Sequence, residues 1–211
     1  MDFQQRFDKG EVIEFENPTL VLASASPYRA PILENHGIWY IKILADTNEA
    51  KLQKAYKHKD IDLDYAKNYT ASLALEKQKP FQNRIKNGAV ITCDTVIWCN
   101  SQIIEKPLTK EKCREHHLLL SGKTNYAITA IAVTYNNKTL CGIKVSPNKV
   151  AKLPEKIIEE ICNEPETLNT AGYRIGGVFG KYCNINKTDM QNVIGLDVPL
   201  LLSILKKLGF N

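Results

Sequence analysis

The segment from Ser24 to Arg29 combines hydroxyl, proline and arginine residues in a pattern that could bind phosphate. It follows the apolar run Thr19–Ala23, so the sequence predicts a strand, a turn and then a helix. The amino terminus of a helix presents unpaired N–H groups, and the Ser hydroxyls and the Arg29 guanidinium would add further donors. The same residues would also suit an ordinary helix start, with Ser26 as the N-cap and Pro27 in the first turn.

Asp94 follows the apolar run Ala89–Cys93, which is typical of a buried strand. A carboxylate at the end of such a strand can hold a divalent metal or take a proton from water. An aspartate that only caps a turn would occupy the same place. Glu49, Lys77 and Lys106 each resemble solvated surface charges when they are considered singly. They would matter for chemistry only if the fold brings them to Asp94.

Two glycine-containing segments resemble nucleotide-binding motifs but do not fit them. Gly122-Lys123-Thr124 matches the end of a P-loop, but that motif requires glycine where this chain has His117. The segment is better explained as the end of a helix. The glycines between Gly172 and Gly180 lack the spacing of a dinucleotide-binding loop, so they predict turns or a close approach of the backbone to a ligand.

Predicted strands and helices alternate along the chain. Tyr65, Tyr69 and Leu73 recur every four residues, so they predict a helix that would carry Lys77 on or beside its apolar face. The strongest hairpin signal is Asn136-Asn137, which lies between two apolar runs. The other predicted elements are a helix ending at His36; a strand at Trp39–Leu44; a loop or surface helix at Asp46–Asp64; a hairpin of Val96–Trp98 with Gln102–Ile104; helices at Thr109–Leu120, Lys156–Cys162 and Val198–Leu208; and two short strands around Gly172–Ile185.

These elements predict an α/β fold with a mixed sheet. Residues 1–17 are polar and we interpret them as a leader, whereas residues 18–211 form a single predicted domain. The chain of 211 residues is long enough to bury its own core. Its 44% hydrophobic and 24% charged content excludes the disordered and fibrous classes.

Charge and cysteine usage narrow the function classes further. The net charge of +5 is mild, so we expect an anionic small-molecule ligand and no stable nucleic-acid binding. The apolar runs are too short to cross a membrane, and the first 17 residues lack the apolar centre of a secretory signal. Six scattered cysteines without a C-x-x-C pair predict reduced thiols in a cytoplasmic protein. With four histidines at no paired spacing, they also predict no structural zinc.

A series of short motifs resembles, in chain order, the Maf family of septum-formation-protein-like nucleoside triphosphate pyrophosphatases. The resemblance covers roughly Thr19 to Phe210. Each motif alone would be a weak signal, but the order and spacing make the set specific. The motifs are L-A-S-x-S-P-x-R at Leu22–Arg29, a D-E segment with Glu49, L-A-x-x-K at Leu73–Lys77, D-T-V at Asp94–Val96, K-P at Lys106-Pro107, L-S-G-K-T at Leu120–Thr124, A-G-Y at Ala171–Tyr173 and N-V-I-G-L at Asn192–Leu196.

The resemblance implies an elongated α/β fold with a central twisted mixed sheet flanked by helices. It implies two lobes with the nucleotide in the cleft between them, and it is compatible with a homodimer. It also implies that a nucleoside triphosphate is cleaved to monophosphate and pyrophosphate with a divalent metal, Mg²⁺ or Mn²⁺. Carried onto this chain, the catalytic residues are Asp94, Glu49, Lys77 and Lys106, with Asp94 and Glu49 also holding the metal, and the substrate-binding residues are Ser24, Ser26, Tyr28, Arg29 and Thr95.

Three positions depart from the commonest family pattern, and all three are expected to touch the base or sugar. Tyr28 stands where many members have an Arg, although a subgroup acting on 7-methyl-GTP has an aromatic residue there. Asn125 replaces a frequent His, and Gly176 lies where the pyrimidine-nucleotide subgroup has a Gln. An aromatic ring could stack on a purine or a cationic 7-methylguanine, so we predict a preference for these bases over dTTP and UTP. Packing of Tyr28 against the neighbouring lobe is the alternative.

The leading hypothesis is an enzyme that removes non-canonical or modified nucleotides, with the link to cell-division arrest that the family name implies. The alternative is a nucleotide-binding regulator of septum formation with weakened catalysis. The presence of Asp94, Glu49, Lys77 and Lys106 together favours the enzyme. A nucleic-acid-binding module is disfavoured because aromatic residues are not interleaved with a basic face.

Overall fold

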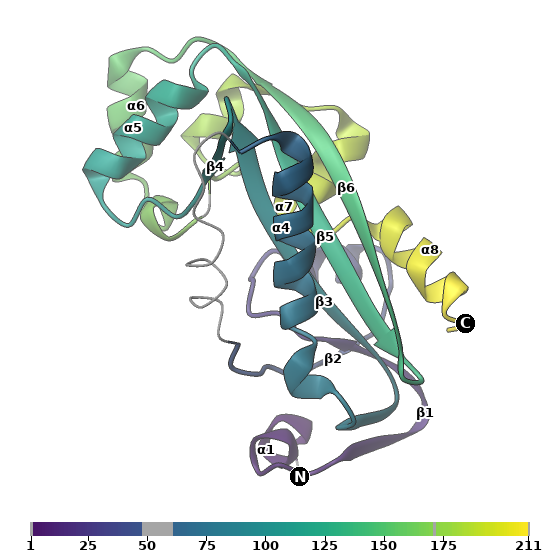
Figure 1. Ribbon diagram of the computed structural model, residues 1–211. Helices are drawn as coiled ribbons and strands as arrows, with labels where there is room; N and C mark the ends of the chain where they lie inside the picture. Colours follow the sequence, from purple (N-terminus) through teal and green to yellow (C-terminus); the bar gives the residue numbers. More distant parts are fainter. Residues whose placement is uncertain (1, 48–60, 171, 211) are drawn as a thin grey trace.

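A long twisted sheet forms the centre of the computed structural model, which describes residues 2–47, 61–170 and 172–210 (Figure 1). Within these ranges seven strands pair in the order β2-β1-β3-β5-β6-β7, and β4 pairs with β3. β1 is parallel to β2 and β3, whereas the other pairs are antiparallel, so the predicted mixed sheet is confirmed. The strands are β1 (Ile13–Leu22), β2 (Ile41–Lys42), β3 (Ile85–Cys99), β4 (Gln102–Ile104), β5 (Thr124–Tyr135), β6 (Lys138–Val150) and β7 (Cys183–Asn184).

Helices flank both faces of this sheet, as the predicted α/β fold requires (Figure 1). α4 packs against β3, β5 and β6, and α7 and α8 pack against β5 and β6. No helix in the described ranges is both long and apolar enough to cross a membrane. The helices are α1 (Phe3–Asp8), α2 (Arg29–Asn35), α4 (Leu63–Glu76), α5 (Lys110–Leu120), α6 (Glu155–Asn163), α7 (Met190–Ile194) and α8 (Val198–Lys207), and the 3₁₀ turns are η1 (Lys79–Phe81), η2 (Thr167–Asn169), η3 (Val178–Tyr182) and η4 (Lys187–Asp189).

Two large hydrophobic clusters divide the molecule into two lobes joined by the long strands. In the first lobe, Leu33 of α2 and Leu201 of α8 are buried against apolar residues of β1, β3 and β5. In the second lobe, Cys113 of α5 and Ile158 of α6 are buried with Phe179 of η3. Figure 1 shows α5 and α6 at one end of the elongated molecule and α1 at the other.

Local capping explains where several of the predicted helices begin and end. The Thr109 hydroxyl accepts a hydrogen bond from the Lys112 N–H at 3.2 Å, and α5 starts at the next residue. Gly122 follows α5 with a φ of 71°, a left-handed conformation that glycine adopts without strain. The Asp197 carboxylate caps α8 in the same way by accepting from the Leu200 N–H at 2.9 Å.

The predicted hairpins are confirmed by backbone conformation and register. Asn136 and Asn137 have φ values of 47° and 61° and join β5 to β6, as expected of a two-residue turn with both residues left-handed. Asn100 and Ser101, with φ values of 51° and 60°, join β3 to β4 in the same manner.

Other predicted boundaries are wrong. The predicted strand Trp39–Leu44 is reduced to two residues of β2, and the Trp39 side chain is 70% exposed. Around Gly172–Ile185 only β7 forms a strand in the described residues, and the 3₁₀ turn η3 occupies Val178–Tyr182 directly before it. Most of the predicted loop or surface helix at Asp46–Asp64 lies outside the described residues.

The segment that we interpreted as a polar leader carries regular structure. It forms α1 and the first residues of β1, and it buries Phe7, Ile13 and Phe15. These apolar residues are separated by charged ones, which made the segment polar on average although its apolar side chains share one cluster with Phe81.

Candidate active site

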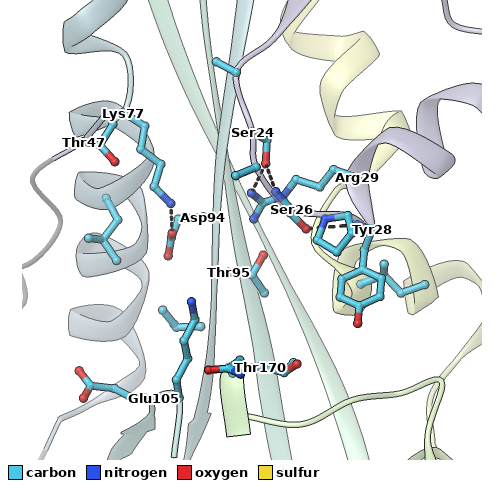
Figure 2. A pocket seen from close by; sticks show the side chains of 18 of the residues that line it. Ser24, Ser26, Tyr28, Arg29, Thr47, Lys77, Asp94, Thr95, Glu105 and Thr170 are labelled. Atoms are coloured by element: carbon cyan, nitrogen blue, oxygen red, sulfur yellow. Dashed lines mark hydrogen bonds and ion pairs between the residues drawn. The ribbon is translucent and has the colours of Figure 1, made fainter. Parts of the chain in front are cut away.

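A cavity of about 1180 Å³ lies at the junction of the two lobes (Figure 2). The loop after β1, the end of α4 and the middle of β3 line one part of it. Residues of α1 and α7 and the segments that follow β2, β4 and η2 line other parts. Of the nine predicted site residues, eight line this one cavity: Ser24, Ser26, Tyr28, Arg29, Lys77, Asp94, Thr95 and Lys106. The ninth, Glu49, lies outside the described residues.

The cavity lies beside a gap in strand pairing along one edge of β3. β1 pairs with β3 as far as Leu22 and Ile91, and β4 begins to pair at Ile97. Between these points no strand within residues 2–47, 61–170 and 172–210 pairs with this edge of β3. Asp94 and Thr95 lie in this gap, where a ligand can approach the strand from the side.

The expectation that Asp94 ends a strand is therefore wrong, because Asp94 lies in the interior of the 15-residue strand β3. The apolar run Ala89–Cys93 ends there, but the strand continues because β5 pairs with it on the other edge from Val90 to Trp98. What ends near Asp94 is the pairing with β1. A ligand site at the carboxyl end of a parallel strand is the general arrangement in α/β sheets.

Strand alternation directs Asp94 and Thr95 to opposite faces of the sheet. Thr92 donates its hydroxyl proton to the Ala74 carbonyl of α4, and Val96 packs in the cluster that includes Leu73. Asp94 shares their parity, so its side chain also lies on the α4 face. Figure 2 shows Asp94 turned toward α4, with Thr95 between it and the Ser24–Arg29 loop.

Lys77 and Asp94 form an ion pair within the cavity. The Lys77 Nζ atom donates to Asp94 Oδ1 at 2.6 Å, and the two side chains are only 15% and 13% exposed. Lys77 is the C-cap residue of α4, where a cation also interacts favourably with the carbonyl end of the helix. The L-A-x-x-K and D-T-V motifs thus meet through their charged residues.

The loop after β1 is held by its own serine hydroxyl groups. Ser24 Oγ accepts from the Ser26 N–H at 3.3 Å, and Ser26 Oγ accepts from the Tyr28 N–H at 3.4 Å. α2 starts at Arg29 with Tyr28 as its N-cap, so the predicted helix start with Ser26 as N-cap and Pro27 in the first turn is wrong. Two backbone N–H groups that we expected to face phosphate are engaged within the loop, whereas the serine hydroxyl protons remain available as donors.

Arg29 is a buried connector, with only 9% of the residue exposed. Its Nε atom donates to the Gly195 carbonyl at 2.9 Å, and its Nη1 atom donates to Ser24 Oγ at 2.8 Å. Gly195 has a φ of 124°, and a Cβ atom there would lie 3.2 Å from Thr95 Oγ1 and 3.4 Å from Arg29 Nε. Arg29 therefore joins the first motif to the glycine of the last one, and its remaining N–H groups carry the positive charge at the cavity wall.

Thr95 can only accept a hydrogen bond from a ligand through its hydroxyl group. Its Oγ1 atom lies 2.9 Å from Thr129 Oγ1, and Thr129 donates its single hydroxyl proton to the Asn192 carbonyl at 2.7 Å. Thr95 must therefore donate to Thr129, which leaves lone pairs for a ligand donor. This polarity suits a water molecule or a sugar hydroxyl and does not suit a phosphate oxygen.

Tyr28 connects the two lobes across the cavity. Its hydroxyl donates to Glu166 Oε2 at 3.2 Å, and Arg174 Nε lies 3.8 Å from the same oxygen. The predicted alternative, that Tyr28 packs toward the neighbouring lobe, thus has a contact in its favour, although the residue also lines the cavity. Gly176 lines the cavity as well, and a Cβ atom there would meet no atom of the described residues within 4 Å.

Asn125 does not reach the cavity, contrary to the expectation that it touches the base or sugar. It is fully buried, it donates to the Asn148 carbonyl at 3.2 Å, and it accepts from the Tyr173 hydroxyl at 2.8 Å. Burial raises the pKa of Tyr173, so its phenol stays protonated and donates this bond. Asn125 therefore contacts Tyr173, which lines the cavity, and not the cavity itself.

Comparison with known proteins identifies the family of this chain. A family model described as Maf-like protein matches residues 19–208.

The chain belongs to the Maf family.

Curated relatives of this Maf chain carry one recurring name, dTTP/UTP pyrophosphatase. A protein of that name from Pyrococcus abyssi is 27% identical over 193 residues, covering 90% of this chain and 96% of the relative. One from Desulfitobacterium hafniense is 31% identical over 185 residues, covering 84% and 79% of the two chains. One from Bacillus anthracis is 28% identical over 193 residues, covering 91% and 96%.

Sequence reasoning missed several polar residues of the Maf cavity. Glu105 lines it directly before the K-P motif, and Thr170 lines it directly before the A-G-Y motif (Figure 2). Both could have been found as polar neighbours of a recognised motif. Asp46 also lines the cavity, but nothing in its sequence surroundings distinguishes it from a loop aspartate.

The cavity is lined by carboxylate residues of the type that binds a hard divalent cation. Asp94, Asp46 and Glu105 all line it, and carboxylate oxygens are the ligands that Mg²⁺ and Mn²⁺ prefer. Asp94 is the least exposed of the three, and its Oδ1 atom accepts a hydrogen bond from Lys77. The predicted second ligand, Glu49, lies outside the described residues.

Proposed function

We propose that this protein hydrolyses a nucleoside triphosphate to the nucleoside monophosphate and pyrophosphate. The observation that carries the proposal is the half-buried Lys77–Asp94 pair in the gap beside β3, opposite the Ser24–Arg29 loop. A cavity of about 1180 Å³ has room for a nucleoside triphosphate. The names of the relatives agree with this reaction.

Asp94 is the proposed proton acceptor for the attacking water. Water adds to the α-phosphorus, its proton passes to the Asp94 carboxylate, and the bond from the α-phosphorus to the bridging oxygen of pyrophosphate breaks. Lys77 donates a hydrogen bond to Asp94 and presents positive charge to the phosphate chain. Glu49 is proposed as the helper carboxylate, on the family resemblance alone.

Lys106 and the serine loop are proposed to hold the phosphate chain. Lys106 is exposed at the cavity wall, so its ammonium can reach phosphate oxygens at little cost in desolvation. The Ser24 and Ser26 hydroxyl groups donate toward the phosphates, with the Arg29 charge behind them. A divalent ion held by Asp94, Glu49 and the neighbouring carboxylates would supply Lewis acidity to the phosphate oxygens.

The relatives' names point to pyrimidine nucleotides, whereas two features of this chain favour a larger base. Tyr28 offers an aromatic ring at the cavity wall, and Gly176 leaves open the space that a glutamine side chain would fill. We therefore retain the prediction that purine or 7-methylguanine nucleotides are preferred. Removal of modified nucleotides from the cellular pool is the corresponding proposed role.

A regulator of septum formation with weakened catalysis is the competing function. It would bind nucleotide in the same cavity, so binding alone does not separate the two. A panel of nucleoside triphosphates with Mg²⁺ or Mn²⁺, assayed separately for pyrophosphate and orthophosphate, decides between them. The enzyme releases pyrophosphate from at least one substrate with many turnovers. Binding without turnover would favour the regulator, and release of orthophosphate alone would contradict the reaction.

A further inference from the structure

Cys113, His117 and Cys162 meet in the interior of the second lobe, away from the cavity. Cys113 and His117 lie one turn apart on α5, and Cys162 lies near the end of α6. One potential ligand atom from each residue lies within 4.8 Å of the others. The three residues are 0%, 1% and 6% exposed. They form the only group of this kind that is found among the described residues.

The spacing of Cys113 Sγ and His117 Nδ1 matches that of two ligands of a tetrahedral metal ion. Zn–S bonds of about 2.3 Å and Zn–N bonds of about 2.0 Å, at tetrahedral angles, separate two ligand atoms by about 3.5 to 3.8 Å. Cys113 Sγ lies 3.5 Å from His117 Nδ1. The third ligand atom, from Cys162, lies within 4.8 Å of both, so a metal ion could join the three side chains once they draw together by a short distance.

His117 Nδ1, the ring nitrogen beside Cys113 Sγ, is the atom that would bind the ion. It also lies 2.8 Å from the Cys113 carbonyl, which can only accept, so Nδ1 carries the proton while no ion is bound. An ion at Nδ1 would displace this proton, and the neutral imidazole would then carry its proton on Nε2. Among the described residues, both Nε2 and the Glu164 Oε2 atom are buried without a hydrogen-bond partner. A histidine that binds a metal commonly donates its other N–H to a carboxylate, so Glu164 is the candidate acceptor for this proton.

We propose that Cys113, His117 and Cys162 bind a single Zn²⁺ ion. Two thiolates and a neutral imidazole are soft and borderline donors, which select zinc over Mg²⁺ or Ca²⁺. The two thiolate charges cancel the charge of the ion, so the ligated group is neutral and compatible with the surrounding apolar cluster. The sequence predicted no structural zinc because the third ligand comes from a different helix.

The ion would fasten α5 to α6 next to the cavity wall. Glu164 follows Cys162 closely, and its Oε1 atom accepts from the Val178 N–H at 2.9 Å. The intervening segment carries Asn169, Thr170 and Tyr173, which line the cavity. Zinc would thus stabilise the part of the second lobe that holds one side of the nucleotide site, without touching the substrate. It is separate from the oxygen-ligand site at Asp94.

Cobalt substitution tests the proposal in the full-length wild-type protein. The reduced protein is stripped with chelator and titrated with Co²⁺, and the thiolate-to-cobalt charge-transfer band is followed. We expect the band to saturate at one Co²⁺ ion per chain and to disappear when Zn²⁺ displaces the cobalt. Elemental analysis of the zinc-loaded protein after dialysis should then give one zinc ion per chain. The carboxylates of the cavity contain no sulfur and cannot produce this band. No charge-transfer band, or a band that does not saturate at one equivalent, would overturn the proposal.

Matched variants locate the site. The tightly bound metal ion should be lost in each of three variants, Cys113→Ala, Cys162→Ala and His117→Gln. Cys99→Ala should retain it. Cys99 is an apt control because it is buried in the same apolar cluster but is not one of the three residues. Zinc also should raise the melting temperature of wild type and of Cys99→Ala, but not that of the other variants. Retention of the band in Cys113→Ala, or a Cys113–Cys162 disulfide in the protein as purified, would refute the assignment.

Discussion

The Lys77 ammonium lies 2.6 Å from Asp94 Oδ1, so the last turn of α4 is tied to the interior of β3 at the point where the pairing with β1 ends. Both side chains are mostly shielded from water, which strengthens their interaction relative to a surface pair. The pair places a carboxylate and an ammonium together in the gap where a phosphate chain can enter.

Replacing Asp94 by Asn should reduce kcat by about 100- to 10,000-fold, because the amide keeps the shape but cannot accept the proton. Steady-state kinetics on the best substrate of the panel provides the measurement, and circular dichroism confirms that the variant is folded. Asp64→Asn, at an exposed aspartate of α4, is the matched control and should turn over at the wild-type rate. Near-normal turnover by Asp94→Asn would remove Asp94 from the mechanism.

Lys106→Ala and Lys77→Ala should both lower turnover, but they should differ in stability. Lys106 is exposed, so its loss should leave the free energy of unfolding within about 0.5 kcal/mol of wild type. Lys77→Ala removes a hydrogen-bond partner of the shielded Asp94 carboxylate and should destabilise by about 1 kcal/mol or more. Urea unfolding measures both. Lys67→Ala, on the surface of α4, serves as the control. Destabilisation without any change in kinetics would indicate that the lysine has only a structural role.

Arg29→Lys should be destabilising although it keeps the charge. A lysine cannot donate to both Gly195 and Ser24 with the geometry of the guanidinium group. We therefore expect the free energy of unfolding to fall by about 2 kcal/mol and the KM for the nucleotide to rise. Denaturant unfolding and substrate titration provide the readouts. Arg114→Lys, which affects only a surface ion pair on α5, should change neither. Equal behaviour of the two variants would contradict the connecting role of Arg29.

Base preference should depend on Tyr28. We expect higher kcat/KM for 7-methyl-GTP or GTP than for UTP and dTTP, and we expect Tyr28→Ala to reduce the purine values by about tenfold through lost stacking. Tyr28→Phe separates the two roles of this residue, because it keeps the ring and removes the hydrogen bond to Glu166. A wild-type preference for UTP or dTTP, or an unchanged ratio in Tyr28→Ala, would reject the stacking proposal.

Gly176→Gln tests the other half of the specificity argument. The backbone there has open space for a side chain, so the variant should fold normally. A glutamine would introduce an amide group at the cavity wall, where it can pair with the edge of a pyrimidine, and the ratio of UTP to GTP activity should rise. A ratio identical to that of wild type would show that position 176 does not contact the base.

The elements of the fold were largely predictable because local signals agree with the tertiary structure. Thr109, Asn136-Asn137 and Asp197 act through their nearest neighbours, so their helix caps and turns can be inferred from a short window. The interior position of Asp94 could not be inferred, because it depends on β5 pairing from a distant part of the chain. The same limit explains why the contacts of Asn125 were assigned wrongly.

The sequence predicted which residues line the site, but it did not predict which of them bond to one another. Motif order placed Lys77 and Asp94 in one set, yet only the folded chain shows that they pair with each other. Likewise, Arg29 was expected to bind phosphate directly, and its bond to the Gly195 carbonyl depends on a segment from the far end of the sequence. Contacts of this kind are set by packing between elements and leave no local pattern.

The most direct test of the proposed reaction follows the oxygen of the attacking water. The enzyme hydrolyses its best nucleoside triphosphate in ¹⁸O-labelled water with divalent metal, and mass spectrometry locates the label in the products. Attack at the α-phosphorus predicts one ¹⁸O atom in the nucleoside monophosphate and none in the pyrophosphate, with the rate strongly reduced in Asp94→Asn. Label in the pyrophosphate, or release of orthophosphate in its place, would contradict the account.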